Sequence, residues 1–244
     1  MIKKVLVLTF TLFLIQSTAL FSQEKGDYEL YMNSAKELSI LYRGTAPLNY
    51  NFVSTGTYFA YSKEYAKGDL LYNNKLYKDV LLNINSHLDE LYLFVEENGM
   101  PIMLNKDFVE KFNIGSRNYL HLKFPKNKRS LEDGFYELLW SNGQDSLVKK
   151  RKKNYEVRID QSINLTTESK VQRIFTPIDK YYIFNNELEE QVKRFAHISS
   201  FYKVRNSKVR RFIKENNLDV KLNKDEAFKR VVEFINSSLL IDKK

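Results

Sequence analysis

The stretch GDLLYNNKLYKDVLLNI, residues 68–84, predicts two adjacent β-strands. Leu70–Tyr72 and Leu76–Ile84 are largely apolar and flank the dipeptide Asn73-Asn74. Asn tolerates the left-handed backbone conformations that a two-residue hairpin turn requires. The stretch therefore predicts a β-hairpin.

Comparable segments follow along the chain, separated by turn signals such as Asn98-Gly99 and Asn142-Gly143. The further predicted strands are Leu88–Val95, Ile102–Leu104, Tyr119–Phe124, Phe135–Trp140, Ser146–Lys150, Val171–Phe175 and Tyr181–Phe184. We expect a short helical turn at Asp107–Phe112 and a loop at residues 160–170. A spacing of about ten residues without long intervening helices favours an antiparallel meander. We predict a mainly β (α+β) fold, a curved meander sheet or half-barrel from about Phe52 to Phe195.

Helical periodicity is confined to the two ends of the predicted sheet. Residues 27–43 predict an N-terminal helix that Gly44 and Pro47 end. A C-terminal helical pair is predicted, its first helix capped by Ser207 and its second by Asn223 with Glu226. The apolar faces of this pair comprise Val209, Phe212 and Ile213, then Phe228, Val231, Val232 and Ile235. We expect the helices to pack on the sheet.

The N-terminus has the pattern of a secretory signal peptide. Lys3 and Lys4 precede the apolar run Val5–Ile15, which is short for a membrane-spanning helix. We predict removal of residues 1–22, with cleavage after Ala19 as the second choice and a retained N-terminal anchor as the alternative. Residues 23–198 then form the β domain and residues 199–244 a C-terminal helical segment. The expected location is periplasmic or secreted, as a soluble protein.

Composition excludes several chemistries. The 244 residues include no Cys, which rules out a lipid-modified cysteine, a disulfide scaffold and a thiol nucleophile. His87, His121 and His197 lack metal-ligand spacing, and no nucleotide-binding motif is present. We therefore predict no metal, no cofactor and no catalytic residue. The acid doublets Asp89-Glu90 and Glu96-Glu97 cannot form facing pairs, because adjacent strand residues point to opposite faces.

Positive charge is concentrated in the second half of the chain. Residues 126–244 hold 26 basic and 17 acidic side chains. The run Lys149, Lys150, Arg151, Lys152 and Lys153 is open to two interpretations: a strand edge kept soluble by charge, or a polyanion contact. Export argues against nucleic acid as the partner. The abundant aromatic residues, 17 Phe and 16 Tyr, predict a sheet core, with a sugar-binding platform or a lipid cavity as the alternative.

Several stretches carry a resemblance in their order along the chain. They are LYRG (41–44), GDLLYNNKLYKDVLLNI (68–84), DELYLF (89–94), FNIG (112–115), GFYELLW (134–140), LVKKRKK (147–153), YIF (182–184) and SKVRRFIKENNLDVKLNKDEAF (207–228). Together they resemble a group of uncharacterised secreted proteins of Bacteroidetes-type bacteria. The resemblance implies an exported bacterial protein and supplies no activity. Asp145-Ser146-Leu147 also resembles the O-glycosylation motif of that phylum, which makes Ser146 a candidate for modification.

These observations predict an exported, non-catalytic cell-envelope protein that binds a glycan, lipid or protein partner. Two alternatives remain. One is a periplasmic carrier of lipids or lipoproteins, since a curved sheet can enclose a cavity. The other is a hydrolase whose carboxylates come together from distant strands.

Overall fold

A computed structural model describes residues 30, 40–96, 99–123, 131–159, 171–219 and 221–241. Its contacts divide the chain into two units, Met1–Gly44 and Thr45–Lys244. In the first unit, Leu30 is helical and Ile40–Tyr42 form a 3-10 turn. The predicted signal peptide and most of the predicted N-terminal helix lie outside the described residues.

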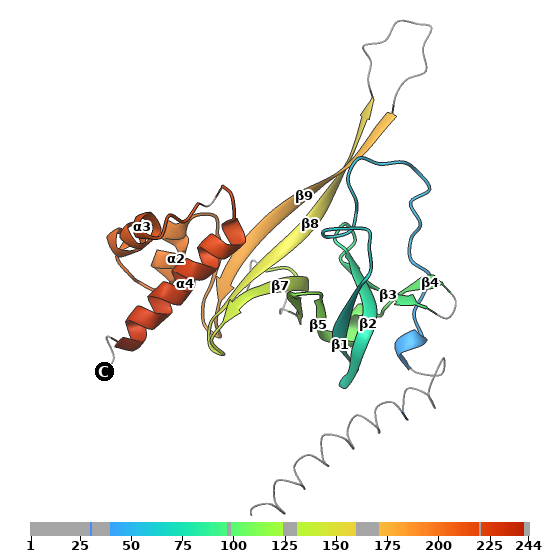
Figure 1. The fold of residues 1–244 in the computed structure, drawn as a ribbon, viewed down its shortest axis with the longest axis horizontal. Helices are drawn as coiled ribbons and strands as arrows, with labels where there is room; N and C mark the ends of the chain where they lie inside the picture. Colours follow the sequence, from blue (N-terminus) through green and yellow to red (C-terminus); the bar gives the residue numbers. More distant parts are fainter. Residues whose placement is uncertain are drawn as a thin grey trace, which may run out of the picture. The chain divides into compact units, whose positions relative to one another are not determined.

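The second unit contains one open, curved sheet of ten antiparallel strands (Figure 1). The strands are β1 (Ala66–Tyr72), β2 (Lys75–Asn85), β3 (Glu90–Val95), β4 (Met100–Met103), β5 (Val109–Ile114), β6 (Arg117–Leu122), β7 (Gly134–Ser141), β8 (Ser146–Ile159), β9 (Val171–Phe184) and β10 (Glu189–Val192). Their order in the sheet is β10-β9-β8-β7-β6-β5-β1-β2-β3-β4. The mainly β prediction is confirmed, and the sheet is open.

Local turn signals placed the first strands well. Asn73 and Asn74 adopt φ of 52° and 59°, the left-handed values that the hairpin between β1 and β2 requires. The predicted helical turn at Asp107–Phe112 is correct only at its start. A 3-10 turn covers Lys106–Phe108, and strand β5 follows at once.

The strand order departs from a simple meander at one place. β5 pairs with β1, so the meander β1–β4 and the meander β5–β10 are joined edge to edge. Gly68 makes the close approach possible, because a Cβ atom there would lie 1.9 Å from the backbone oxygen of Asn113. This joint was not visible in the sequence.

β8 and β9 form the longest pair, which we call the ribbon. Its register runs without a break from Ser146 opposite Phe184 to Ile159 opposite Val171. The sequence predicted three short strands here, Ser146–Lys150, Val171–Phe175 and Tyr181–Phe184, where the structure has two long ones. Pro177 is tolerated because it lies opposite Lys153, at a position whose backbone nitrogen points away from β8. The outer half of the ribbon extends beyond β7 and β10 (Figure 1).

Residues 45–60, which we call the strap, contact one edge of the ribbon. The amide of Thr55 donates to the Arg173 oxygen at 2.8 Å, and the amide of Phe175 donates to the Thr55 oxygen at 2.9 Å. Aromatic rings from both segments pack together, with centroids of adjacent rings 4.5–6.5 Å apart. The cluster comprises Tyr50, Phe52, Tyr58, Tyr155 and Phe175. Phe175 is buried and the other four rings are half-buried, so the cluster is a partly covered contact between strap and ribbon. The predicted core role of the Tyr and Phe excess is confirmed elsewhere, as at Tyr92, Tyr136 and Phe228, which are fully buried.

Three helices follow the sheet: α2 (Phe195–Phe201), α3 (Asn206–Glu215) and α4 (Lys224–Ile241). The prediction of a helical pair missed α2, and the predicted boundary at 198/199 falls inside it. The prediction of a Ser207 cap is wrong, because α3 already begins at Asn206. The Asn223 cap is confirmed, since its side-chain oxygen accepts from the Glu226 amide at 3.1 Å.

The helices bury one face of the sheet at its β7–β10 end. Their shared core combines strand residues with the apolar stripes of all three helices: Leu147, Tyr181, Ile183, Val192, Ile198, Phe201, Val209, Phe228, Val231, Val232 and Ile235. Tyr181 meets Phe228 edge to face, with ring centroids 5.1 Å apart. The C-terminal segment is therefore packed on the sheet, as expected.

Candidate functional site

The five cations at 149–153 alternate between the two faces of β8. Leu147, Lys149 and Arg151 share the face that the C-terminal helices cover in part, while Lys150 and Lys152 lie on the opposite face. The run therefore contributes cations to two separate clusters, one on each face of the sheet.

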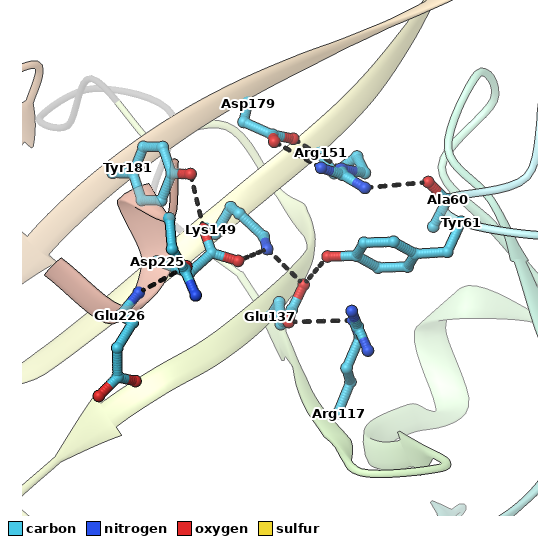
Figure 2. Close-up of polar contacts among 11 residues, drawn as sticks. Ala60, Tyr61, Arg117, Glu137, Lys149, Arg151, Asp179, Tyr181, Asp225 and Glu226 are labelled. Atoms are coloured by element: carbon cyan, nitrogen blue, oxygen red, sulfur yellow. Dashed lines mark hydrogen bonds and ion pairs between the residues drawn. The ribbon is translucent and has the colours of Figure 1, made fainter. Parts of the chain in front are cut away.

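Lys149 is fully buried between two carboxylates (Figure 2). Its ammonium lies 3.0 Å from Glu137 of β7 and also donates to Asp225 in the first turn of α4. The Tyr181 hydroxyl donates to the other oxygen of Asp225 at 2.6 Å. Burial alone would lower the pKa of Lys149, but Glu137 and Asp225 outweigh it and raise that pKa. Lys149 thus links the sheet to α4.

Tyr61, which follows the strap, completes this cluster. Its hydroxyl donates to Glu137 at 2.5 Å, and burial together with that hydrogen bond raises its pKa. Figure 2 shows its ring between the guanidinium groups of Arg117 and Arg151, whose centres lie 3.9 and 4.1 Å from the ring centroid. Arg151 also donates to both oxygens of Asp179, at 2.7 and 2.6 Å. These contacts orient Tyr61 by hydrogen bonding and by cation–π attraction.

A second buried ion cluster occupies the opposite face of β8. Lys150, with its side chain 3 % exposed, lies 2.7 Å from Asp89, which also accepts from Lys106. Burial lowers the pKa of Lys150 to about 8. Burial would raise the pKa of Asp89, but the two ammonium groups hold it below its usual value. Gly134 borders the cluster closely, because a Cβ atom there would lie 2.1 Å from Asp89 Oδ2 and from Lys150 Nζ.

The remaining cations of the run are also engaged. Lys152 pairs with Glu132 at the surface, and the backbone of Lys153 bonds to the loop after β2. The side chains of Lys149 to Lys152 thus meet carboxylates of the same chain. The polyanion contact predicted for this run remains a prediction, which these internal pairs make less favourable.

Exposed positive charge gathers on α3 and the segments beside it. The sequence from residue 193 to residue 233 holds 12 basic and five acidic side chains. Val209 of α3 is buried, whereas Arg210 and Lys214 are exposed one helical turn apart. Arg211 is also exposed and pairs with Glu215 at 2.7 Å. Lys208, Arg211 and Lys214 are all exposed, away from the apolar stripe of Val209, Phe212 and Ile213.

An open hollow of about 360 Å³ lies between the ribbon and the start of α4. Its lining residues are Arg151, Asp179, Tyr181, Lys221, Leu222, Asn223, Lys224 and Asp225. Asp179 and Asp225 already bind Arg151 and Lys149, so Lys221 and Lys224 contribute the cationic groups here without a carboxylate partner among the described residues. Lys221 and Lys224 of the hollow thus add to the positive charge of α3 and the segments beside it.

The three histidines do not come together. Each Nδ1 donates to a backbone carbonyl: His87 to Lys153 at 2.9 Å, His121 to Val109 at 2.9 Å and His197 to Gln191 at 2.7 Å. Within the described ranges, no group of three or more potential metal ligands occurs. None of the helices described is long and apolar enough to cross a membrane.

The other residues singled out in the sequence have local contacts. Asp89 belongs to the Lys150 cluster, and Glu90 accepts from the Tyr92 hydroxyl at 2.8 Å. Ser146 begins β8, half-buried, with its hydroxyl 3.1 Å from that of Ser141. Its O-glycosylation stays a prediction.

The sequence identified the cations at 149–153 but not the carboxylates that pair with them. Glu137 and Asp225 were not singled out, because their pairing with Lys149 depends on the fold. The basic face of α3 had a visible signal, since its charges follow a helical period opposite Val209. Its use as a surface was not proposed.

The resemblance to secreted bacterial proteins likewise stays a prediction. No family model, curated protein or solved structure matches the chain.

Proposed function

We propose that this protein is an exported, non-catalytic binding protein of the cell envelope that contacts an anionic partner through α3. The observation that carries the proposal is that some of its cations are paired with internal carboxylates while others are exposed and unpaired with any described acidic residue. Lys149 to Lys152 of β8 meet carboxylates of the same chain, whereas Arg205, just before α3, and Arg210 and Lys214 of α3 are exposed and have no acidic partner among the described residues. Exposed cations in a group raise the local concentration of anions.

The acidic residues support a non-catalytic role. Glu137 is buried, Asp89 is largely buried and Asp225 is half-buried beside the hollow, and each is held by a lysine of the same chain. A general acid or base needs a proton-transfer partner within hydrogen-bond reach and access to substrate. These carboxylates instead stabilise buried ammonium groups.

The test is charge reversal on α3 in the full mature chain. Arg205→Glu/Arg210→Glu/Lys214→Glu should abolish most binding to phosphatidylglycerol vesicles and to heparin, and wild-type binding should weaken with added salt. The matched control, Lys63→Glu/Lys67→Glu/Lys111→Glu, changes three exposed lysines near β1 and β5 by the same total charge. If both triple variants lose binding equally, the effect depends on net charge alone, which would contradict a site on α3.

Export requires its own test. The intact mass of protein recovered from the native host should correspond to a chain beginning at Gln23. Recovery of the chain with Met1 retained in a membrane fraction would contradict the proposal.

A further inference from the structure

The outer half of β8 has an open edge. β7 pairs with β8 only as far as Lys149, and Lys153 then donates its amide to the Ser86 oxygen at 2.9 Å. Among the described residues, no strand pairs with this edge from Tyr155 to Ile159. Such an edge is a template for pairing with another strand.

The direction of the free backbone groups follows from the neighbouring hydrogen bonds. The amide and the carbonyl of Lys153 both point away from β9, since they bond to Ser86 and to His87. Because backbone direction alternates, Tyr155, Val157 and Ile159 also present their amides and carbonyls to the open edge. The opposite edge of the ribbon agrees, since Arg173 and Phe175, across from Val157 and Tyr155, bond outward to the strap.

The side chains of this edge divide by face. Val157 is 50 % exposed and Ile159 is 59 % exposed, on the same face as Tyr155. Glu156 and Arg158 lie on the other face and bond to each other at 3.1 Å. The edge therefore combines an exposed apolar row with one acid and one base.

We propose that two copies of this chain pair antiparallel through the outer edge of β8, about a twofold axis at Val157. Val157 then lies opposite Val157 of the second copy, and Tyr155 lies opposite Ile159. Each of these pairs exchanges two backbone hydrogen bonds, because the groups involved are those that point outward. Glu156 of each copy lies opposite Arg158 of the other.

Charge complementarity favours a second copy of this chain as the partner and selects the register of the pair. An axis at Glu156 would oppose two glutamates, and an axis at Arg158 would oppose two arginines. An axis at Tyr155 would oppose Arg158 and Lys152. Opposite charges across strands are favourable and like charges are unfavourable. The axis at Val157 is therefore the register among these in which every charged pair attracts, and its twofold symmetry makes the edge complementary to itself.

The contact is short, so we expect a reversible dimer whose fraction depends on concentration. Sedimentation velocity of the full mature chain measures that dependence. Glu156→Arg and Arg158→Glu each replace attraction by repulsion at two symmetric pairs and should raise the dimer dissociation constant about tenfold. The double exchange Glu156→Arg/Arg158→Glu restores opposite charges and should recover most of the affinity.

Cross-linking tests the axis itself. The chain has no cysteine, so Val157→Cys introduces a single thiol. Directly opposed residues in a hydrogen-bonded antiparallel pair have Cα atoms about 5.5 Å apart, which suits a disulfide. Val157→Cys should therefore oxidise to a covalent dimer much faster than Val171→Cys, whose residue lies on the other strand of the ribbon and is also exposed.

The outcomes separate the alternatives. A wild-type chain that sediments as a monomer at every concentration, or equal cross-linking by the two cysteine variants, would overturn the proposal. A dimer that the charge reversals leave unchanged would place the contact elsewhere. Circular dichroism of each variant checks that the sheet is intact, and recovery in the double exchange excludes misfolding as the cause of the losses.

Discussion

At the scale of single residues, the protein uses lysine ammonium groups as internal ties. Lys149 joins β7 to α4, and Lys150 joins β8 to the turn before β3. Removing one partner of such a buried pair leaves an uncompensated charge, which is strongly destabilising. Neither tie can bind an external anion without losing its internal carboxylate.

Gly134 offers a direct test of the Lys150 tie. In Gly134→Ala, the new methyl group would collide with Asp89 and Lys150, and the φ of +150° would strain any L side chain. We expect a loss of about 3 kcal/mol in the free energy of unfolding, measured by urea denaturation. Gly143→Ala is the matched control, because its φ is +91° but the space around it is open. It should cost about 1 kcal/mol, and equal losses would show that the ion cluster contributes nothing.

At the scale of elements, the joint between β1 and β5 holds the two meanders in one sheet. Gly68→Ala would place a methyl group against the backbone of Asn113, which cannot rotate away. We expect a loss of about 2–3 kcal/mol in the free energy of unfolding, with faster amide exchange in β1 and β5 than in β8 and β9. Gly115→Ala, in the nearby turn between β5 and β6, meets no neighbour, so its φ of +58° alone should cost about 1 kcal/mol, and it serves as the control for the clash. Uniformly faster exchange would argue against a local joint.

Elements were predictable where their signals are local. Asn73-Asn74 specifies its turn through backbone preference alone, and α3 shows its buried stripe through helical period. The full length of β8 was not predictable, because its charges are compatible with a strand interior only when Asp89 and Asp225 arrive from elsewhere. The basic surface of α3 was not predicted for a similar reason. The sequence shows which residues are charged, while the fold decides which of them face solvent.

At the scale of the whole molecule, opposing proton equilibria shape stability at high pH. Burial raises the pKa of many tyrosines above their usual 10.0, including Tyr65, Tyr92, Tyr119, Tyr136, Tyr181 and Tyr202. Their stabilisation is complete below pH 10 and is lost above it, because the unfolded chain then releases protons more readily. Lys150 acts in the opposite sense, since its pKa falls from 10.5 to about 8 on folding.

We therefore expect the contribution of Lys150 to the free energy of unfolding to increase between pH 8 and 10. In that range the unfolded chain binds more protons at Lys150 than the folded chain, so stability increases with pH. Above pH 10 the tyrosines reverse the trend. Urea denaturation from pH 6 to 11 should show this maximum. Lys150→Met should lose most of the rising limb, the rest coming from Lys153, whose pKa burial also lowers, and should keep the alkaline fall. Parallel curves for the two proteins would contradict the assignment to Lys150.

The strap has a consequence for the order of folding. Thr55 is synthesised long before Arg173 and Phe175, to which it bonds. The ends of the strap can bond earlier, to Met103 of β4 and to residues 84–86 at the end of β2. Phe52, in the middle of the strap, lacks its partners Tyr155 and Phe175 until β8 and β9 have been made. Contacts between residues distant in sequence form slowly, because a long loop must close first. The middle of the strap is therefore among the last parts of the second unit to dock, and until then Phe52 is a ring on which a folding assistant or an aggregating neighbour would act.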